Sequence, residues 1–214
     1  MRDAYGDRTV DTALRALDLL IAGGTLLVSA PLLAAVAAAI RLADGPPILY
    51  RGERVGRGGR VFEMYKLRTL APGAELRLGT VLGDELTALH EHEATRLGRI
   101  LRAVHVDELP QLWNVVRGDM SMVGPRPIRP AFFAELTAEI PQYWQRLVVR
   151  PGVTGFAQTR VRREETWGDK LAHDLEYIAD RSVALYLQVL GSTVTRIARR
   201  TWQGLVNRGE PSAR

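Results

Sequence analysis

The feature that most constrains this chain is a long apolar segment near its N-terminus. Leu19 to Ile40 covers 22 residues without one charged side chain. A straight helix of that length measures roughly 33 Å, which is enough to cross a hydrocarbon core of roughly 30 Å. Length alone therefore favours a single membrane-spanning helix.

Pro31, in the middle of this segment, favours a different interpretation. Proline removes a helix hydrogen bond and pushes a carbonyl aside, and the hydroxyl of Ser29 can satisfy a carbonyl freed in this way. The two halves are roughly 18 and 13 Å long, too short to span a bilayer alone. We therefore predict a re-entrant helix-break-helix that bends at Ser29 and Pro31 and returns to the same leaflet.

The charges on both sides of the segment agree with two cytoplasmic ends. Three arginines precede it and five follow it between Arg41 and Arg60, and cytoplasmic flanks are enriched in basic residues. A cleaved secretory signal is not expected, because the apolar stretch is too long and no convincing cleavage site precedes the arginine-rich run. We expect a monotopic protein on the cytoplasmic face of the cell membrane.

Composition limits the remaining possibilities only in part. The 214 residues are enough for one well-buried domain plus an anchor. The formal charge is +5, which fits nucleic acid, anionic lipid or an anionic small substrate and does not choose among them. The absence of cysteine excludes disulfides, Cys-ligated zinc and thiol catalysis.

The rest of the chain predicts a small compact cytosolic domain of the α+β class that is mostly helical. Apolar residues at 48–50 and 61–65 flank a glycine-rich turn and predict a β-hairpin. A tight turn is expected at 150–155. The predicted helices are 95–104, 107–116, 130–147 with an interruption near Pro141, 167–180, and an amphipathic C-terminal helix from Val183.

The C-terminal helix has two interpretations. It either packs on the domain or lies in the lipid interface, with its terminal arginines and Trp202 at head-group level. With this helix included, we predict three parts. Residues 1–42 form the lead-in and re-entrant helix, 43–205 the catalytic domain, and 206–214 a disordered tail.

Two adjacent carboxylates, Asp107 and Glu108, stand at the predicted start of a helix. Consecutive helical residues point about 100° apart, so the two groups cannot play the same part. One can attack phosphorus as a nucleophile while the other holds Mg²⁺, which binds one or two carboxylates plus phosphate oxygens. The alternative is a pair of solvated acids favoured by the helix dipole.

Five basic residues stand beside turns or element boundaries and are candidate phosphate ligands: Lys66, Arg68, Arg102, Arg126 and Arg150. Guanidinium groups bind phosphate in a bidentate manner, and Arg126 is held between two prolines that restrict its backbone. The alternative for each residue is scattered surface charge.

The histidines give weaker signals. The sequence His90-Glu91-His92-Glu93 matches no reliable zinc spacing and is interpreted as a solvated charged loop. His105, just before the acidic pair, is either a turn residue or a proton donor.

Several ordered blocks of sequence together resemble the bacterial sugar transferase family. These are the monotopic polyprenyl-phosphate phosphoglycosyl transferases that start glycan and exopolysaccharide assembly on a lipid carrier. The likeness runs from about Leu17 to about Arg200. In chain order the blocks are Ile48–Gly56, Tyr65–Thr69, Thr95–Arg102, Asp107–Val115, Gly118–Pro127 and Arg150–Gln158.

The resemblance implies a reaction and a role for each site residue. A sugar-1-phosphate passes from a nucleoside diphosphate sugar, expected to be a UDP-sugar, to a polyprenyl phosphate such as undecaprenyl phosphate. Asp107 attacks the β-phosphate and forms a phosphosugar-aspartate, which the lipid phosphate then displaces in a ping-pong sequence. Glu108, with Asp107 beside it, holds Mg²⁺. The five basic residues neutralise phosphate oxygens.

The chain departs from the family pattern in three places. Ala30 stands where the family has a serine before Pro31, His105 replaces a serine before the aspartate, and Leu70 replaces a methionine. None of these changes removes a group that the chemistry needs.

The expected partners are the nucleotide sugar, the polyprenyl phosphate and membrane lipids, with no nucleic acid and with a homo-oligomer left open. The chain is expected to be a minimal catalytic unit. The rival interpretation is a catalytically degenerate, membrane-attached basic scaffold or binding protein, and the retained Asp107-Glu108 pair argues against it.

Overall fold

The computed structural model describes residues 9–71, 73–74, 92–160 and 166–206, with side chains up to Arg199. The expected tail after Val206 and the pair His90-Glu91 lie outside these ranges. In chain order the elements are α1 (Thr9–Ala43), β1 (Leu49–Val55), η1 (Arg57–Gly59), β2 (Val61–Leu67), α4 (Arg96–Ala103), η2 (Val106–Glu108), α5 (Gln111–Arg117), β3 (Ser121–Val123), α6 (Pro130–Glu139), η3 (Pro141–Val148), β4 (Gly152–Thr154), α7 (Phe156–Arg160), α8 (Trp167–Asp180) and α9 (Val183–Val206).

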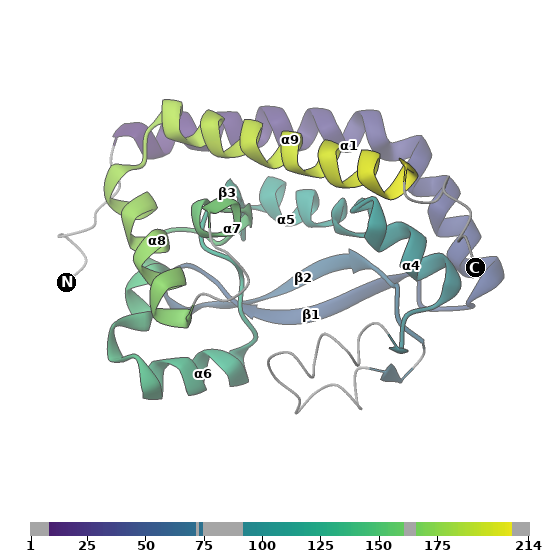
Figure 1. The fold of residues 1–214 in the computed structure, drawn as a ribbon, viewed down its shortest axis with the longest axis horizontal. Coiled ribbons are helices and arrows are strands. Elements are labelled where there is room, and N and C mark those ends of the chain that lie inside the picture. The colour runs from purple at the N-terminus through teal and green to yellow at the C-terminus, as the bar shows by residue number, and fades with distance from the viewer. Residues whose placement is uncertain (1–8, 72, 75–91, 161–165, 207–214) are drawn as a thin grey trace.

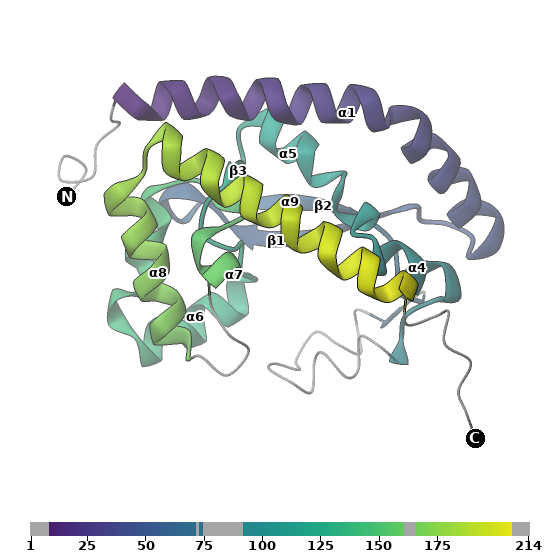
Figure 2. The same ribbon diagram turned by 45° about the horizontal axis from the view of Figure 1, so that its top comes forward.

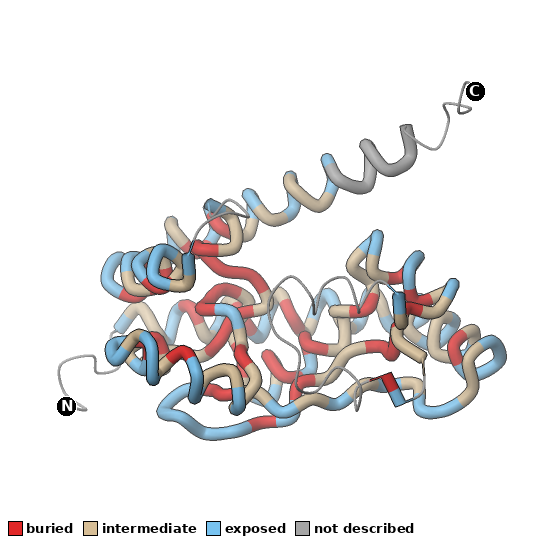
Figure 3. Tube along the Cα trace, turned by 60° about the horizontal axis from the view of Figure 1, so that its bottom comes forward, coloured by how far each residue is buried: buried red, intermediate tan, exposed pale blue. Residues whose placement is uncertain are grey.

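Two long helices, α1 and α9, lie along one face of the molecule, and the other elements lie to one side of them (Figure 1). α9 begins beside the first part of α1, and the two helices then diverge (Figure 2). Buried positions run through the interior, whereas exposed positions follow the outer sides of the helices (Figure 3). The fold is α+β and mostly helical, as the sequence predicts.

The apolar N-terminal segment forms most of α1, which is a single helix of 35 residues. Its most apolar 18-residue window has a mean hydropathy of 2.2, and 6% of that window is buried. Within the described residues, α1 is the one helix long and apolar enough to cross a membrane. Such a surface is suited to lipid and not to the interior of a soluble domain.

The structure differs from the predicted break at Pro31. The proline lies inside α1, which continues through it, and the second half of the helix turns away from the first (Figure 2). A proline bends a helix by losing one hydrogen bond, and the turns on either side can continue. Ser29 Oγ contacts the Leu26 carbonyl at 3.4 Å, not the Leu27 carbonyl that the proline ring faces.

The first half of α1 is bound to the domain through Asp18, which is buried (2% exposed). Its Oδ1 accepts hydrogen bonds from Ser121 Oγ at 2.9 Å, from Met122 N at 2.8 Å and from Tyr186 OH at 2.9 Å. These donors come from β3 and α9, so one carboxylate joins three elements that are far apart in the sequence. Asp18 therefore fixes the apolar helix to the domain.

Two further polar contacts reinforce this attachment. Arg15 donates to the carbonyls of Val115 (2.6 Å) and Val116 (2.9 Å) at the C-terminal end of α5, where helix carbonyls need partners. Arg181 forms a bidentate ion pair with Asp11. Its Nε donates to Oδ1 at 2.7 Å and its NH2 to Oδ2 at 2.9 Å. The start of α1 is thus held by α5 and by the connection before α9.

The predicted hairpin is confirmed and is longer than expected. β1 and β2 pair antiparallel from Leu49↔Leu67 to Val55↔Val61, which places Tyr50 opposite Lys66. Phe62 and Met64 are buried in one cluster with residues of α1 and α5. The hairpin therefore packs one face against the helices, and Lys66 lies on that same face because side chains alternate along a strand.

β3 and β4 form a short parallel pair where the sequence predicts only a tight turn at 150–155. Three-residue strands carry too little alternation to predict. The two backbones cross closely, because a Cβ on Gly124 or Gly152 would overlap the facing main chain. These glycines therefore allow the approach.

The other helix predictions agree with the structure except at the acidic pair. The confirmed elements are α4, α6 with η3 after the interruption at Pro141, α8, and the C-terminal α9. α4 and α8 begin at threonine caps, Thr95 and Thr166, and Asp169 completes a capping box in α8.

Candidate active site

The paired carboxylates Asp107 and Glu108 lie on η2, a single 3-10 turn between α4 and α5. The sequence predicts the first turn of an α-helix here. The structure differs because Pro110 has no N–H to donate and instead occupies the N-cap position of α5. On the other side, His105 has a φ of 57°, in the left-handed region, and turns the chain sharply after α4. The pair is therefore presented on a tight connection between two helices.

Lys66 of β2 contacts Glu108 directly. Its Nζ lies 2.6 Å from Glu108 Oε1. The neighbouring strand backbone is fixed by Asn114 of α5, which is fully buried. Asn114 Oδ1 accepts from the Tyr65 N–H at 3.0 Å, and its Nδ2 donates to the Glu63 carbonyl at 2.6 Å. The hairpin is thus joined to α5 one residue away from the lysine.

The surroundings of Glu108 keep it ionised. Burial alone would raise the pKa of this carboxyl, but the ion pair with Lys66, helped by the charges of Arg126 and His105, holds the pKa below its ordinary value. Arg126 is therefore close enough to act on Glu108 electrostatically.

Asp107 is in the opposite situation. It is buried (6% exposed), and burial raises the pKa of its carboxyl. Lys66 opposes that rise, the neighbouring Glu108 adds to it, and Arg102 and His105 oppose it. The side chain is thus a poorly solvated carboxylate surrounded by cations, which is an environment suited to nucleophilic attack.

The Pro-Arg-Pro segment is held from inside the domain. The Arg126 carbonyl accepts from Arg146 NH2 at 2.9 Å, and Arg146 forms a buried ion pair with Asp174 at 2.7 Å. Arg146 also donates to Tyr143 OH at 2.7 Å. The backbone of Arg126 is therefore fixed, while its side chain is exposed and its charge acts on Glu108.

The structure thus brings three of the five predicted phosphate ligands to the acidic pair, namely Lys66, Arg102 and Arg126. Arg68 has a different contact from the predicted one. It is buried, and its NH1 and NH2 donate to the carbonyls of Asp44, Gly45 and Pro46 at 2.7–2.9 Å. This side chain holds the turn that follows α1.

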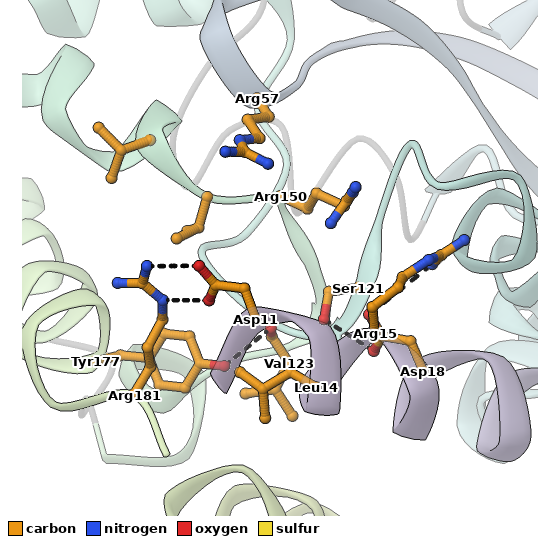
Figure 4. Close-up of a pocket in the computed structure, with 12 residues that line it drawn as sticks. Asp11, Leu14, Arg15, Asp18, Arg57, Ser121, Val123, Arg150, Tyr177 and Arg181 are labelled. Carbon is orange, nitrogen blue, oxygen red and sulfur yellow. Dashed lines mark hydrogen bonds and ion pairs between the residues drawn. The ribbon is translucent and has the colours of Figure 1, made fainter. Parts of the chain in front are cut away.

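Arg150 also lies apart from the acidic pair. Its Nε donates to the Gly118 carbonyl at 2.9 Å, and it lines a small pocket of about 50 Å³ between α1, β3 and α8. Figure 4 shows Arg150 and Arg57 on one side of this pocket and the ion pair of Asp11 with Arg181 on the other. The described residues that line it do not include Asp107 or Glu108.

Sequence reasoning missed the residues that position the site. Asn114 holds the backbone of the hairpin, and Arg146 holds the backbone carbonyl of Arg126. Neither contact is with the acidic pair. A polar residue among the apolar positions of a short helix was the available signal for Asn114, because such a residue must find buried partners. No comparable signal marked Arg146.

The acidic pair fits a magnesium ion that is shared with a substrate. Within the described ranges, no three His, Asp or Glu side chains are grouped closely enough to hold a metal by themselves. Magnesium requires only one or two carboxylates when phosphate oxygens and waters complete its shell. Asp107 and Glu108 supply oxygen ligands of this kind.

An acidic pair ringed by basic side chains, on a domain attached to a long apolar helix, is typical of an enzyme that handles phosphate groups at a membrane. The chain belongs to the bacterial sugar transferase family, whose model matches residues 10–200.

Three relatives illustrate the likeness. The UDP-glucose:undecaprenyl-phosphate glucose-1-phosphate transferase of Caulobacter vibrioides is 41% identical over 86% of this chain and 69% of its own length. The exopolysaccharide production protein PSS of Rhizobium leguminosarum bv. phaseoli is 36% identical over 86% of this chain and 95% of its own length. The UDP-N-acetylgalactosamine-undecaprenyl-phosphate N-acetylgalactosaminephosphotransferase of Aeromonas hydrophila is 34% identical over 86% of this chain. The chain spans 43% of the length of that Aeromonas protein.

Proposed function

We propose that this protein transfers a sugar-1-phosphate from a UDP-sugar to undecaprenyl phosphate and so begins the assembly of a polysaccharide. The observation that carries the proposal is the buried Asp107 beside Glu108, with Lys66, Arg102 and Arg126 acting on the pair. The names of the relatives support it, since two of those above are undecaprenyl-phosphate transferases for sugar phosphates.

In the first step, a carboxylate oxygen of Asp107 attacks the β-phosphorus of the donor. The bond between that phosphorus and the bridging oxygen breaks, and UMP leaves with the bridging oxygen. The sugar phosphate stays on Asp107 as an acyl phosphate. The low exposure of Asp107 limits access of water to this intermediate.

In the second step, a phosphate oxygen of the lipid attacks the same phosphorus. The acyl phosphate bond breaks, the Asp107 carboxylate is restored, and the sugar diphosphate lipid is released. The same aspartate therefore serves both halves of the reaction, which predicts ping-pong kinetics.

The cations lower the repulsion between a negative nucleophile and a negative diphosphate. Lys66 keeps Glu108 ionised through their 2.6 Å contact. Arg102 of α4 acts on the charge of Asp107, and Arg126 of the Pro-Arg-Pro segment acts on that of Glu108. Mg²⁺, held by Glu108 and Asp107, would neutralise charge on the diphosphate and polarise its phosphorus–oxygen bonds. Release of UMP is expected to stop when EDTA removes the metal.

We place α1 in the membrane as a re-entrant helix with both ends on the cytoplasmic face. The bent path of α1 and the polar contacts of its first half with the domain support this placement. Tags at residues 3 and 210 should both be accessible only from the cytoplasm. A tag at residue 3 that is accessible only from outside would mean that α1 spans the bilayer.

The activity test uses the purified full chain in detergent or nanodiscs with Mg²⁺, undecaprenyl phosphate and a panel of nucleotide sugars that includes UDP-glucose and UDP-N-acetylgalactosamine. The expected result is release of UMP and formation of a glycolipid with at least one donor. Release from no donor, with folded protein, would favour the scaffold interpretation.

A further inference from the structure

One face of β1 carries a row of residues that the proposed chemistry has not used. Tyr50, Gly52 and Arg54 alternate along the strand and are half-buried. Because Tyr50 lies opposite Lys66 and Gly52 opposite Met64, this row shares its face with the lysine that contacts Glu108. The row therefore extends away from the acidic pair along the hairpin.

Gly52 leaves space that the side chains on either side of it fill. A Cβ at this position would overlap the Tyr50 hydroxyl and lie 2.9 Å from Arg54 NH1. The Tyr50 ring and the Arg54 guanidinium thus lean toward each other over the glycine, and Tyr50 hydrogen-bonds Arg54. The guanidinium is directed back toward the acidic pair, about 7 Å along the strand from the Tyr50–Lys66 position.

Two more arginines, Arg126 and Arg129, stand in the segment 126–129, which runs beside the end of β1. The Val55 N–H donates to the Ile128 carbonyl at 2.9 Å, which joins this segment to the end of β1. Burial lowers the pKa of Arg54, Tyr50 opposes the shift, and the like charges of Arg129 and Arg126 add to it. Like charges brought this close cost free energy that a bound anion recovers.

Arg126 links this arginine group to the acidic pair, because its charge acts both on Glu108 and on Arg54. A diphosphate placed with its β-phosphate at Asp107 has its second phosphate directly beside the first. We propose that Arg54, oriented by Tyr50 across Gly52, binds the donor phosphate that leaves with the nucleoside.

The position of Arg54 at the far end of the hairpin from Lys66 favours the nucleotide sugar over the lipid as the source of this phosphate. At the Lys66 end of the hairpin, Leu67 packs with Ile40 in the second half of α1. At the Arg54 end, Phe62 packs with Ala22 in the first half of α1, the half that the domain holds. Arg54 lies next to Val55, which pairs with Ile128 just before α6, and this end of β1 is the one near α6 (Figure 1). A lipid phosphate arriving from the second half of α1 therefore reaches Lys66 before it reaches Arg54.

This assignment rests on the proposed function, and binding of UMP tests it separately from turnover. Arg54→Gln is expected to weaken UMP binding, measured by calorimetry on the full chain, by about 10- to 100-fold, which is the loss of a charge-assisted hydrogen bond. Tyr50→Phe keeps the guanidinium but loses its orientation, and should weaken UMP binding by about 2- to 5-fold. The KM for undecaprenyl phosphate should stay unchanged in both variants.

Arg51→Gln is the matched control. It removes the same charge from the same strand, but Arg51 lies on the opposite face, exposed and 5.7 Å from the centre of the Tyr65 ring. UMP binding by this variant should equal that of the wild type.

Three results would overturn the assignment. They are unchanged UMP affinity in folded Arg54→Gln protein, an equal loss in Arg51→Gln, and a rise in the KM for the lipid instead of the loss of UMP binding. Tyr50→Phe gives the same answer if Arg54→Gln does not fold. A wild-type chain that binds UMP through Arg54 but transfers no sugar phosphate would contradict the proposed function and leave this assignment standing.

Discussion

Two buried aspartates, Asp18 of α1 and Asp107 of η2, show how differently one side chain can be held. Asp18 is 2% exposed and its Oδ1 accepts three hydrogen bonds, from Ser121, Met122 and Tyr186. Asp107 is 6% exposed, and in the part of the chain that the structure describes no hydrogen bond reaches its carboxylate. Its charge is balanced instead by nearby cations, with Lys66 the strongest.

This difference separates a structural carboxylate from a reactive one. Oxygen lone pairs that accept three hydrogen bonds are not available to attack phosphorus, and Asp18 therefore serves to fix α1 to the domain. A carboxylate that is held by charge alone keeps its lone pairs free for bond formation, while the same cations receive the incoming phosphate. Substitution of Asp18 should therefore lower stability, whereas substitution of Asp107 should abolish turnover.

The largest expected effect is on turnover in Asp107→Asn. An amide cannot form the acyl phosphate, so release of UMP should fall by at least about a thousandfold. Asp169→Asn, at the exposed cap of α8, is the charge-matched control and should retain activity. Turnover of Asp107→Asn within about tenfold of the wild type would move the nucleophile to another residue.

The next largest effect is on stability in Asp18→Ala. The substitution leaves the Ser121, Met122 and Tyr186 donors buried without their acceptor, so the free energy of unfolding should fall by about 3 kcal/mol. For a chain of this size that corresponds to a fall in Tm of about 10 °C, measurable by thermal denaturation in detergent. Tyr186→Phe removes one donor only and should cost about 1 kcal/mol. A Tm unchanged in Asp18→Ala would mean that α1 is attached mainly by its apolar contacts.

A smaller effect is expected in Lys66→Met, where the pH profile is the informative measurement. The pKa of Glu108 lies below 4.5 because of Lys66, so in the wild type this carboxylate stays ionised through mildly acidic pH. Without the lysine its pKa rises, and activity should be lost at a higher pH as the solution is acidified. At pH 7.5 turnover should fall by about 10- to 100-fold.

Lys170→Met is the control for this profile, because Lys170 lies 4.2 Å from the centre of the Trp167 ring on α8 and the chain has no third lysine. Its activity and acid limb should match those of the wild type. An unshifted acid limb in Lys66→Met would show that another group keeps Glu108 ionised.

The smallest effect is a gain in stability in Asp107→Asn. The folded state raises the pKa of Asp107 above its ordinary value of 3.8, so its ionised form costs stability above the raised pKa, and this cost disappears as the pH falls toward 3.8. The amide should therefore raise the free energy of unfolding at pH 8, and this gain should shrink as the pH falls toward 3.8. A loss of stability at pH 8 would mean that the carboxylate has a structural partner.

The two aspartates also differ in whether the sequence predicts their roles. Asp107 is predicted to be the nucleophile because its motif, next to Glu108 and shortly before Gly118–Pro127, resembles that of the family, and this role stays a prediction. Asp18 gave no signal, since an isolated acid beside an apolar segment resembles an ordinary flank and its partners lie more than 100 residues away. Periodicity predicted the long helices and the hairpin, but β3 and β4 are too short to carry a period.

The basic residues show the same limit at the site. Lys66, Arg102 and Arg126 act electrostatically on the acidic pair, and their binding of phosphate stays a prediction. Arg68 is turned toward the carbonyls after α1, which no sequence pattern reveals, because a basic residue beside a turn can face either the turn or a ligand. The direction of such a side chain depends on partners that are distant in the sequence. For Arg68 these partners are the carbonyls of the turn after α1.

The central claim is that Asp107 carries the sugar phosphate between donor and lipid. The direct measurement is peptide mass spectrometry of wild-type protein mixed with Mg²⁺ and the active UDP-sugar, quenched in acid before any polyprenyl phosphate is added. A sugar-phosphate adduct on Asp107, absent from Asp107→Asn, is the expected result. An adduct on another residue, or release of UMP with Asp107 unmodified throughout, would contradict it.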